Sequence, residues 1–140
     1  MKVLFVCHGN INRSAAGEII LKAKKPDWEV KSAALKDTKG NERTAKKMRE
    51  ALVEMGYPGE LRSTPISQEL VDWADVIFYM DDSNERKLED KFGKEVFDKA
   101  KRLGSIIGVH KIPDPHFAQG NELHKQVIKM VDLALDKHFP

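Results

Sequence analysis

The sequence predicts an α/β fold, a single domain with a four-stranded parallel sheet and helices on both faces. Short apolar runs alternate with segments in which apolar residues recur at helical spacing, the pattern of such sheets. A length of 140 residues with 41% hydrophobic content suits one buried core, so we expect one domain over residues 1–140. A loop rich in Gly and Asn separates the first strand from the first helix.

The first strand and helix lie at the start of the chain. Lys2–Val6 is a short apolar run rich in β-branched and aromatic residues, and it predicts a buried strand. From Ala15 onward a helical face follows, and Pro26 closes it. The apolar residues of that face are Ala16, Ile19, Ile20 and Ala23.

A second strand and helix come next. Trp28–Ala34 is predicted to be a strand, and Lys36–Glu42 a polar turn. The helix that follows is expected to end at Gly56. Its buried face consists of Ala45, Met48, Leu52 and Met55.

The third strand should be central, because Asp75–Met80 is almost continuously apolar, as in sheets covered on both faces. A charged helix over Ser83–Phe92 is expected after it. A further helix over Lys94–Leu103 and a weaker fourth strand over Ile106–Ile112 complete the predicted sheet. That strand leads into the loop Pro113-Asp114-Pro115.

The closing helix is predicted over Glu122–His138, with apolar residues at four-residue intervals. Strands that alternate with helices form parallel sheets with right-handed crossovers, and ligands bind at the carboxyl ends of such strands. Cys7 follows the first strand and Asp114 the fourth. We therefore expect both side chains to face one crevice.

Composition excludes several functional classes. Twenty-four Lys and Arg residues against 22 Asp and Glu give a net charge of +2 with the signs interspersed, so nucleic acid is not an expected partner. The first ten residues are too polar for a signal peptide or a membrane span, which predicts a cytoplasmic protein without a membrane partner. One cysteine and no tight His/Cys cluster predict neither a disulfide nor a structural zinc site, and no cofactor is expected.

The chemistry is concentrated in residues 7–14, here called the Cys7 loop. Cys7 and Arg13 stand at its ends with five residues between them, and the loop lies between a strand and a helix. Successive backbone N–H groups of such a loop can converge on one anion, and the helix N-terminus adds partial positive charge. Arg13 can chelate two phosphoryl oxygens with its planar guanidinium. Positive surroundings favour the thiolate form of Cys7, to which Ser14 can donate a hydrogen bond.

Simpler interpretations exist for each residue taken alone. Cys7 could be a small buried hydrophobe at a strand end. Gly9 and Asn10 could simply form a tight turn, although both also accept left-handed backbone. Asp114 could be an ordinary turn aspartate before proline. The position of the Cys-to-Arg spacing between a strand and a helix favours the catalytic interpretation.

These segments resemble the low-molecular-weight protein tyrosine phosphatases. The stretch VLFVCHGNINRSAAGE is similar to the family's opening signature, and IPDPHF to its distal Asp-Pro loop. Between them, SAA at residues 32–34 and MDDSN at residues 80–84 match two further family segments in the expected order. The resemblance extends over essentially the whole chain.

The resemblance implies a two-step mechanism without a metal. Cys7 would form a cysteinyl-phosphate, while Asp114 acts first as general acid and then as base. Arg13 and the loop amides would hold the phosphoryl oxygens. By analogy Asn10 hydrogen-bonds to Ser32 and keeps the loop in its strained shape. The substrate would contact the loop and its rim, through His8, Gly9, Asn10, Ile11, Asn12, Ser14 and Phe117.

Two departures from the family pattern affect regulation and the pocket rim. Most members carry a second cysteine where this chain has Asn12, so a protective disulfide cannot form here. An arsenate reductase that relays electrons through several cysteines is excluded for the same reason. At the rim, the aromatic positions of the family correspond to Thr38, His116 and Phe117, and only Phe117 is an aromatic hydrocarbon. His8 is expected to pack its ring beside the strand.

The predicted substrate is a phosphorylated protein, most simply phosphotyrosine, or a small aryl phosphate, with inorganic phosphate or other oxyanions as product or inhibitor. Ile11 favours phosphotyrosine, because phosphoarginine-directed members typically carry Thr there. Three alternatives remain at this point: a phosphatase for phosphoarginine or another small ester, a non-catalytic phosphoprotein-binding module, and a phosphocysteine carrier. Such carriers lack the pair of Arg13 and Asp114, and a binding module needs no general acid. A monomer is expected.

Overall fold

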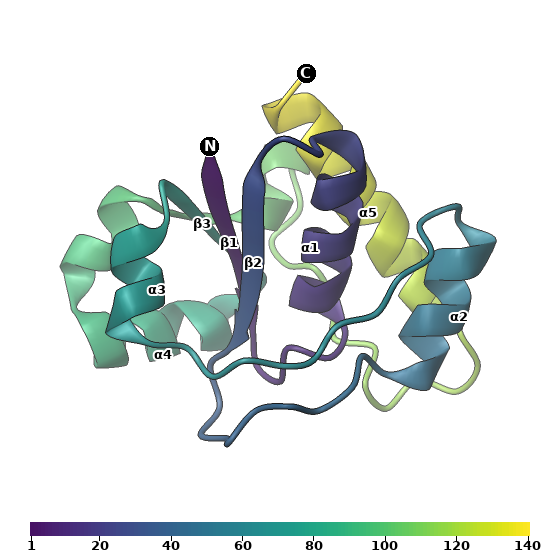
Figure 1. Cartoon of the computed structure of the whole chain (residues 1–140), viewed down its shortest axis with the longest axis horizontal. Coiled ribbons are helices and arrows are strands. Elements are labelled where there is room, and N and C mark those ends of the chain that lie inside the picture. Colours follow the sequence, from purple (N-terminus) through teal and green to yellow (C-terminus); the bar gives the residue numbers. More distant parts are fainter.

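A four-stranded, all-parallel sheet forms the centre of the molecule in the computed structural model, which describes residues 1–140 (Figure 1). The strands lie in the order β2-β1-β3-β4. They are β1 (Lys2–Cys7), β2 (Glu29–Ala34), β3 (Val76–Tyr79) and β4 (Ala100–Arg102). The predicted fold class is therefore confirmed.

Helices cover both faces of the sheet (Figure 1). α1 (Arg13–Lys24), α2 (Lys46–Glu54) and α5 (Glu122–His138) lie on one side, where α5 contacts both other helices. The opposite side carries α3 (Gln68–Trp73) and α4 (Asp82–Phe92). No helix is both long and apolar enough to cross a bilayer.

β1 is buried on both faces because it lies between two neighbours and two helical layers. Its alternate residues Phe5 and Cys7 belong to the core shared with α1 and α5, whereas Leu4 and Val6 belong to the core on the α3 side. This alternation follows from the two-residue period of a strand. Cys7 is the last residue of β1, so its side chain lies on the α1 side at the carboxyl end of this strand.

The predicted helix over Lys94–Leu103 is wrong. Gly93 ends α4 with φ 79°, and a short 3₁₀ helix η1 (Lys94–Asp98) is followed by the edge strand β4. Only Ala100 of this strand is buried. Its strand form depends on parallel pairing with β3, in which Ile77 is the partner of Ala100, and not on apolar patterning.

The strand predicted over Ile106–Ile112 is also wrong. A second 3₁₀ helix η2 (Leu103–Ile107) occupies the first part, and Gly108 follows in the left-handed conformation with φ 75°. The chain then continues without regular secondary structure to Ile112, whose N–H donates to the Met80 carbonyl at 2.9 Å. That bond helps to hold the segment leading to Asp114 beside the end of β3.

One helix was not predicted, and two others begin earlier than expected. α3 was not predicted, because six residues are too few to show a helical period; its cap is Ser67, whose Oγ accepts from the Leu70 N–H at 3.2 Å. α4 begins at Asp82, because the Asp81 side chain caps it by accepting from the Asn84 N–H at 2.8 Å. α1 begins at Arg13, which places both Arg13 and Ser14 in its first turn.

Candidate active site

The sulfur of Cys7 is hydrogen-bonded to the Ser14 hydroxyl, which is itself bonded to Asn10. Cys7 Sγ lies 3.0 Å from Ser14 Oγ, and both side chains are buried. Asn10 Nδ2 donates to Ser14 Oγ at 2.8 Å. Because the serine oxygen accepts from Asn10, its own hydrogen is free to be donated to the sulfur, which a Cys7 thiolate can only accept.

Asn10 holds the floor of the Cys7 loop together. It adopts a left-handed conformation with φ 57° and is fully buried. Its amide also donates to Ser32 Oγ at 2.8 Å, and its Oδ1 accepts from the Thr64 N–H at 3.0 Å. Ser32 in turn donates to Glu18 at 2.7 Å. Complete hydrogen bonding stabilises a backbone conformation that a residue with a side chain rarely adopts.

The backbone N–H groups of residues 8–15 make no hydrogen bond within the protein. The loop carbonyls, in contrast, are bonded to neighbouring segments: His8 O accepts from Lys36 N–H at 2.9 Å, and Ile11 O from Ala45 N–H at 2.9 Å. Asn12, the N-cap of α1, provides no capping hydrogen bond, and the first turn has no acidic residue. Unpaired donors at a helix start, without a competing carboxylate, form a site for an anion.

Arg13 is 2% exposed. It is hydrogen-bonded to two segments, the residues just after β3 and the residues just before Asp114. Its Nη1 donates to Asp81 Oδ2 at 2.6 Å and to the Ile112 carbonyl at 3.1 Å. Burial acts to raise the pKa of Asp81, but the hydrogen bonds from Arg13 and the Asn84 N–H outweigh it and hold that pKa below its usual value. The carboxylate is therefore ionised near neutral pH and orients the guanidinium.

Asp114 approaches the same guanidinium from the other side. Its Oδ2 lies 3.6 Å from Arg13 Nη2, and its Oδ1 accepts from the His116 N–H at 3.1 Å. The side chain is about half exposed, at 48%. The loop that carries Asp114 is tied to α2 by Lys47 Nζ, which donates to the Ala118 carbonyl at 2.7 Å. The general-acid candidate thus faces the pocket and remains accessible to a substrate.

One cavity of about 250 Å³ joins these groups. It is lined by Cys7, His8, Gly9, Ile11, Asn12, Arg13, Lys36, Asp114, His116 and Phe117. The predicted acid Asp114 therefore comes together with the predicted nucleophile Cys7 and anion clamp Arg13, although it lies far from both in the sequence. Phe117 is 93% exposed and forms an apolar wall at the rim.

Three placements differ from the sequence prediction. Asn10 and Ser14, expected to contact substrate, do not line the cavity, and both residues are fully buried. Thr38 does not line it either; Lys36, two residues earlier in the same turn, does. His8 does not pack beside the strand but is exposed, with its Nδ1 2.7 Å from Lys87 Nζ.

Residues 2–139 match the sequence profile of the family described as low molecular weight phosphotyrosine protein phosphatase. The chain belongs to this family. The opening signature, the Asp-Pro loop and the four-stranded parallel sheet that we described above are thus those of a low molecular weight phosphatase.

Individual members of the family differ in what they act on. A protein-arginine-phosphatase from Geobacillus stearothermophilus is 31% identical over 107 residues, which cover 76% of this chain and 71% of that protein. A protein tyrosine phosphatase from Entamoeba histolytica, solved with Hepes in its active site, superposes with a TM-score of 0.89 at 26% identity, covering 99% of this chain and 94% of that one. Vibrio vulnificus Wzb in complex with benzylphosphonate superposes with a TM-score of 0.88 at 28% identity, covering 96% of this chain and 94% of that one.

In this phosphatase the sequence reasoning missed Asp81, Lys36 and Lys87. Asp81 falls within the segment MDDSN, so its position directly after a predicted central strand was a usable signal. Lys36 and Lys87 are ordinary surface lysines in the sequence, and only the fold brings them to the cavity region. Burial, with Lys87 and Lys36 adding to it, lowers the pKa of His8, so the ring is neutral at pH 7 and accepts from the Lys87 ammonium.

Proposed function

We propose that this protein is a metal-independent phosphomonoester hydrolase that works through a cysteinyl-phosphate. In this proposal Cys7 is the nucleophile, Arg13 the phosphate clamp and Asp114 the general acid and base. The unpaired N–H groups of residues 8–15, arranged around a buried thiol, are the observation that carries the proposal. A neutral ligand would leave those donors and the Arg13 charge without a matching acceptor.

In the first step the Cys7 thiolate attacks phosphorus and the ester P–O bond breaks. Asp114 gives its proton to the leaving oxygen, so the alcohol departs neutral. The loop amides and Arg13 bind the equatorial oxygens, where charge accumulates in the transition state. Arg13 is already oriented by Asp81, so little reorganisation is needed.

In the second step water attacks the phosphorus of the cysteinyl-phosphate and the S–P bond breaks. Asp114, now a carboxylate, accepts a proton from that water. The departing sulfur leaves as a thiolate, and the Ser14 hydroxyl 3.0 Å away stabilises it by donating a hydrogen bond. Inorganic phosphate is released and both catalytic groups return to their starting protonation states.

The test is hydrolysis of a small aryl phosphate in the presence of EDTA by the native chain, Cys7→Ser and Asp114→Asn. We expect no turnover from the first variant and a loss of roughly two orders of magnitude or more from the second, the effect of removing a general acid. Phosphate or vanadate binding without hydrolysis by the reduced native protein would instead identify a non-catalytic phosphoprotein-binding module.

For the substrate we propose phosphotyrosine in a protein. The apolar side chains of Ile11 and Phe117 line the cavity, and they suit a phenyl ring. Lys36 on the same rim opposes the positive guanidinium of phosphoarginine. Phosphoarginine is the second candidate, because the Geobacillus relative is named a protein-arginine-phosphatase.

Two peptides of identical sequence, one with phosphotyrosine and one with phosphoarginine, separate these candidates. We expect the larger kcat/KM for the phosphotyrosine peptide. Ile11→Thr should reduce the ratio of kcat/KM for the phosphotyrosine peptide to kcat/KM for the phosphoarginine peptide, because it removes apolar contact with the tyrosine ring. Faster turnover of the phosphoarginine peptide by the native protein would overturn the assignment while leaving the cysteinyl-phosphate chemistry intact.

A further inference from the structure

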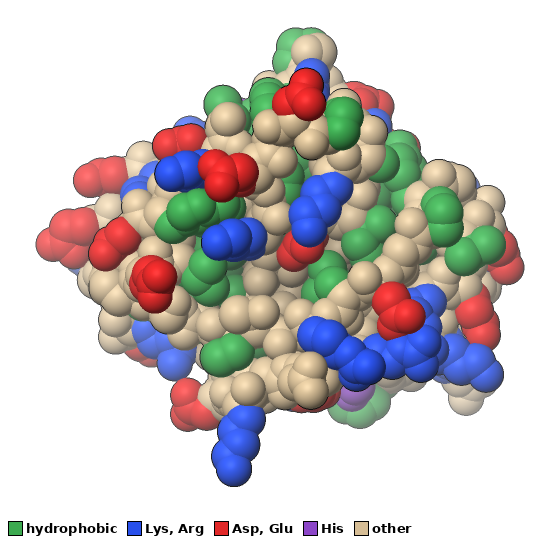
Figure 2. Space-filling view, viewed as in Figure 1, with side chains coloured by type: hydrophobic (Ala, Val, Ile, Leu, Met, Phe, Trp, Pro, Cys, Tyr) green, Lys and Arg blue, Asp and Glu red, His purple; other side chains and the backbone are tan.

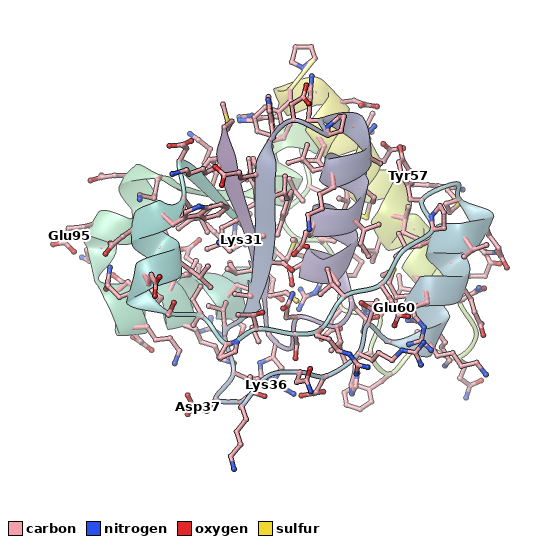
Figure 3. The ribbon with its side chains drawn as sticks, in the orientation of Figure 1. Lys31, Lys36, Asp37, Tyr57, Glu60 and Glu95 are labelled. Atoms are coloured by element: carbon pink, nitrogen blue, oxygen red, sulfur yellow. The ribbon has the colours of Figure 1, made fainter.

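A second cavity, of about 460 Å³, adjoins the catalytic one between α4 and the turn after β2. We call it the lysine cavity; it is lined by His8, Leu35, Lys36, Asp37, Lys87, Asp90 and Lys91. Figure 3 shows Lys36 and Asp37 beyond the end of β2, at the edge of the molecule where the Cys7 loop lies. In Figure 2 the Lys and Arg side chains of the lower surface gather mainly toward the α2 side of that edge.

The two cavities share His8 and Lys36. His8 directly follows Cys7 in the chain and lines both cavities, so the lysine cavity lies next to the one that contains the candidate nucleophile. A side chain in the lysine cavity would therefore belong to a residue next to the phosphorylated one in the substrate. Each residue of an extended peptide advances the chain by at most about 3.3–3.6 Å, so only residues close to the phosphorylated one reach a cavity that shares lining residues with the catalytic one.

The charges in the lysine cavity are unequally paired. Lys36 forms an ion pair with Glu42 at 2.9 Å, and Lys91 lies 3.5 Å from Asp37. Lys87, in contrast, has no carboxylate within ion-pair distance, and its ammonium donates to His8 Nδ1 at 2.7 Å. An ammonium donates three hydrogen bonds and a neutral imidazole nitrogen carries no charge, so Lys87 remains a cation without a counter-ion.

We propose that the lysine cavity binds an anionic side chain adjacent to the phosphorylated residue of the substrate, with Lys87 as its main contact. This specificity rests on the proposed phosphatase function. The anion is a carboxylate of Asp or Glu, or the phosphoryl group of a second modified residue. Asp90 also lines the cavity and opposes an anion, so the preference depends on Lys87 and is moderate in size.

The experiment uses three phosphotyrosine peptides that differ only at the neighbouring position, which is Gln, Glu or Lys. For the native enzyme we expect kcat/KM to be about 5-fold larger with Glu than with Gln, typical of one exposed ion pair at low salt. The preference should vanish in roughly 1 M salt, where the Debye length is only about 3 Å and exposed charges are screened from one another. A fourth peptide with phosphoserine at that position compares a phosphoryl group with a carboxylate.

Lys87→Glu should reverse the order, so that the Lys peptide becomes the better substrate. Arg86→Glu is the matched control: it makes the same change of charge on the same helix, at an exposed residue that lines neither cavity. The control should keep the native preference. Ratios between peptides are compared within each variant, so any general loss of activity cancels.

An equal effect of both substitutions would show that only the overall field matters, and would overturn the subsite. A native enzyme that hydrolyses all the peptides equally would overturn it as well, while supporting the phosphatase. No hydrolysis of any peptide, or unchanged hydrolysis by Cys7→Ser, would instead contradict the proposed function itself.

Discussion

Asn10 decides how the Cys7 sulfur is hydrogen-bonded. The Asn10 amide uses both of its hydrogens on serine oxygens, one on Ser14 and one on Ser32, so each hydroxyl must direct its own hydrogen elsewhere. Ser32 donates to Glu18, and Ser14 donates to Cys7. An apparently local loop is thus connected to β2 and to the middle of α1. The hydrogen bond that stabilises a thiolate follows from this chain of donors.

Ser14→Ala should slow the second step of the reaction more than the first. A hydrogen bond to a charged group contributes about 1.5–3 kcal/mol, so its loss predicts a decrease of about 10- to 100-fold in hydrolysis of the cysteinyl-phosphate. The measurement is a pre-steady-state burst with an aryl phosphate, which should become more pronounced. Ser83→Ala, which deletes a hydroxyl in α4 that makes no hydrogen bond, is the control and should behave like the native protein.

Cys7 is the sole thiol of the chain, and with Asn12 in the same loop no second cysteine is present to form a protective disulfide. We expect peroxide to carry Cys7 beyond the sulfenic state, to species that dithiothreitol cannot reduce. Asn12→Cys, which introduces a thiol into the same loop, should make the inactivation reversible. The readout is the activity recovered after reductant. Full recovery of the native enzyme would contradict the prediction.

At the scale of elements, α1 lies unusually close to β1. A Cβ placed on Gly17 would come within 2.5–2.8 Å of the Phe5 ring, so no side chain fits between the helix and the strand. This close approach brings the start of α1 against the end of β1, where Cys7, Arg13 and Ser14 meet. Glycine is thus required here for packing, not for a special backbone conformation.

Gly17→Ala should therefore destabilise the protein, although alanine is the better helix former. Overpacking costs about 1–3 kcal/mol and the helix propensity returns up to about 1 kcal/mol, so we expect a net loss of about 1–2 kcal/mol. Urea unfolding measures it. Gly9→Ala is the matched control, because a Cβ there meets nothing closer than 3.7 Å, and the free energy of unfolding should stay close to the native value.

At the scale of the whole molecule, histidines whose pKa values are lowered, above all the buried His124, link stability to pH. Burial is the largest influence on the pKa of His124 and lowers it below the usual 6.5; Lys47 lowers it further, and Asp114 acts against this shift. Burial likewise lowers the pKa values of His8 and His138. The unfolded chain therefore binds more protons than the folded one as the pH falls below about 6.5.

Since the folded pKa values are depressed, their stabilising contribution is complete above about pH 6.5 and is lost as the pH falls through the folded values. We expect the free energy of unfolding to decrease between about pH 7 and about pH 5, and His124→Gln to weaken that dependence. Urea titrations at several pH values test this. His116→Gln, at an exposed rim position, is the control and should retain the native slope. An identical slope in all three proteins would contradict the prediction.

Sequence patterns determined the elements that bury long apolar stretches. β1, β2, β3, α1, α2, α4 and α5 were predicted within a few residues, most of them because they show a strand or helix period over enough positions. β4 and α3 were not, since three and six residues carry too little pattern. The edge strand β4 exists because the free side of β3 accepts its backbone, a condition that no local sequence encodes.

For the site, the sequence by itself determined the reactive set. Cys7, Arg13 and Ser14 lie within one loop whose spacing has a mechanical reason, and Asp114 follows from the family resemblance. Only the tertiary structure decided which side chains surround that set. In the folded chain Asn10 and Ser14 are fully buried, and Asp81 accepts a hydrogen bond from Arg13. Lys36 and Lys87 line the same cavity as His8. Local spacing fixes what a short loop can hold, whereas neighbours from distant segments depend on how strands and helices pack, which is a property of the folded chain alone.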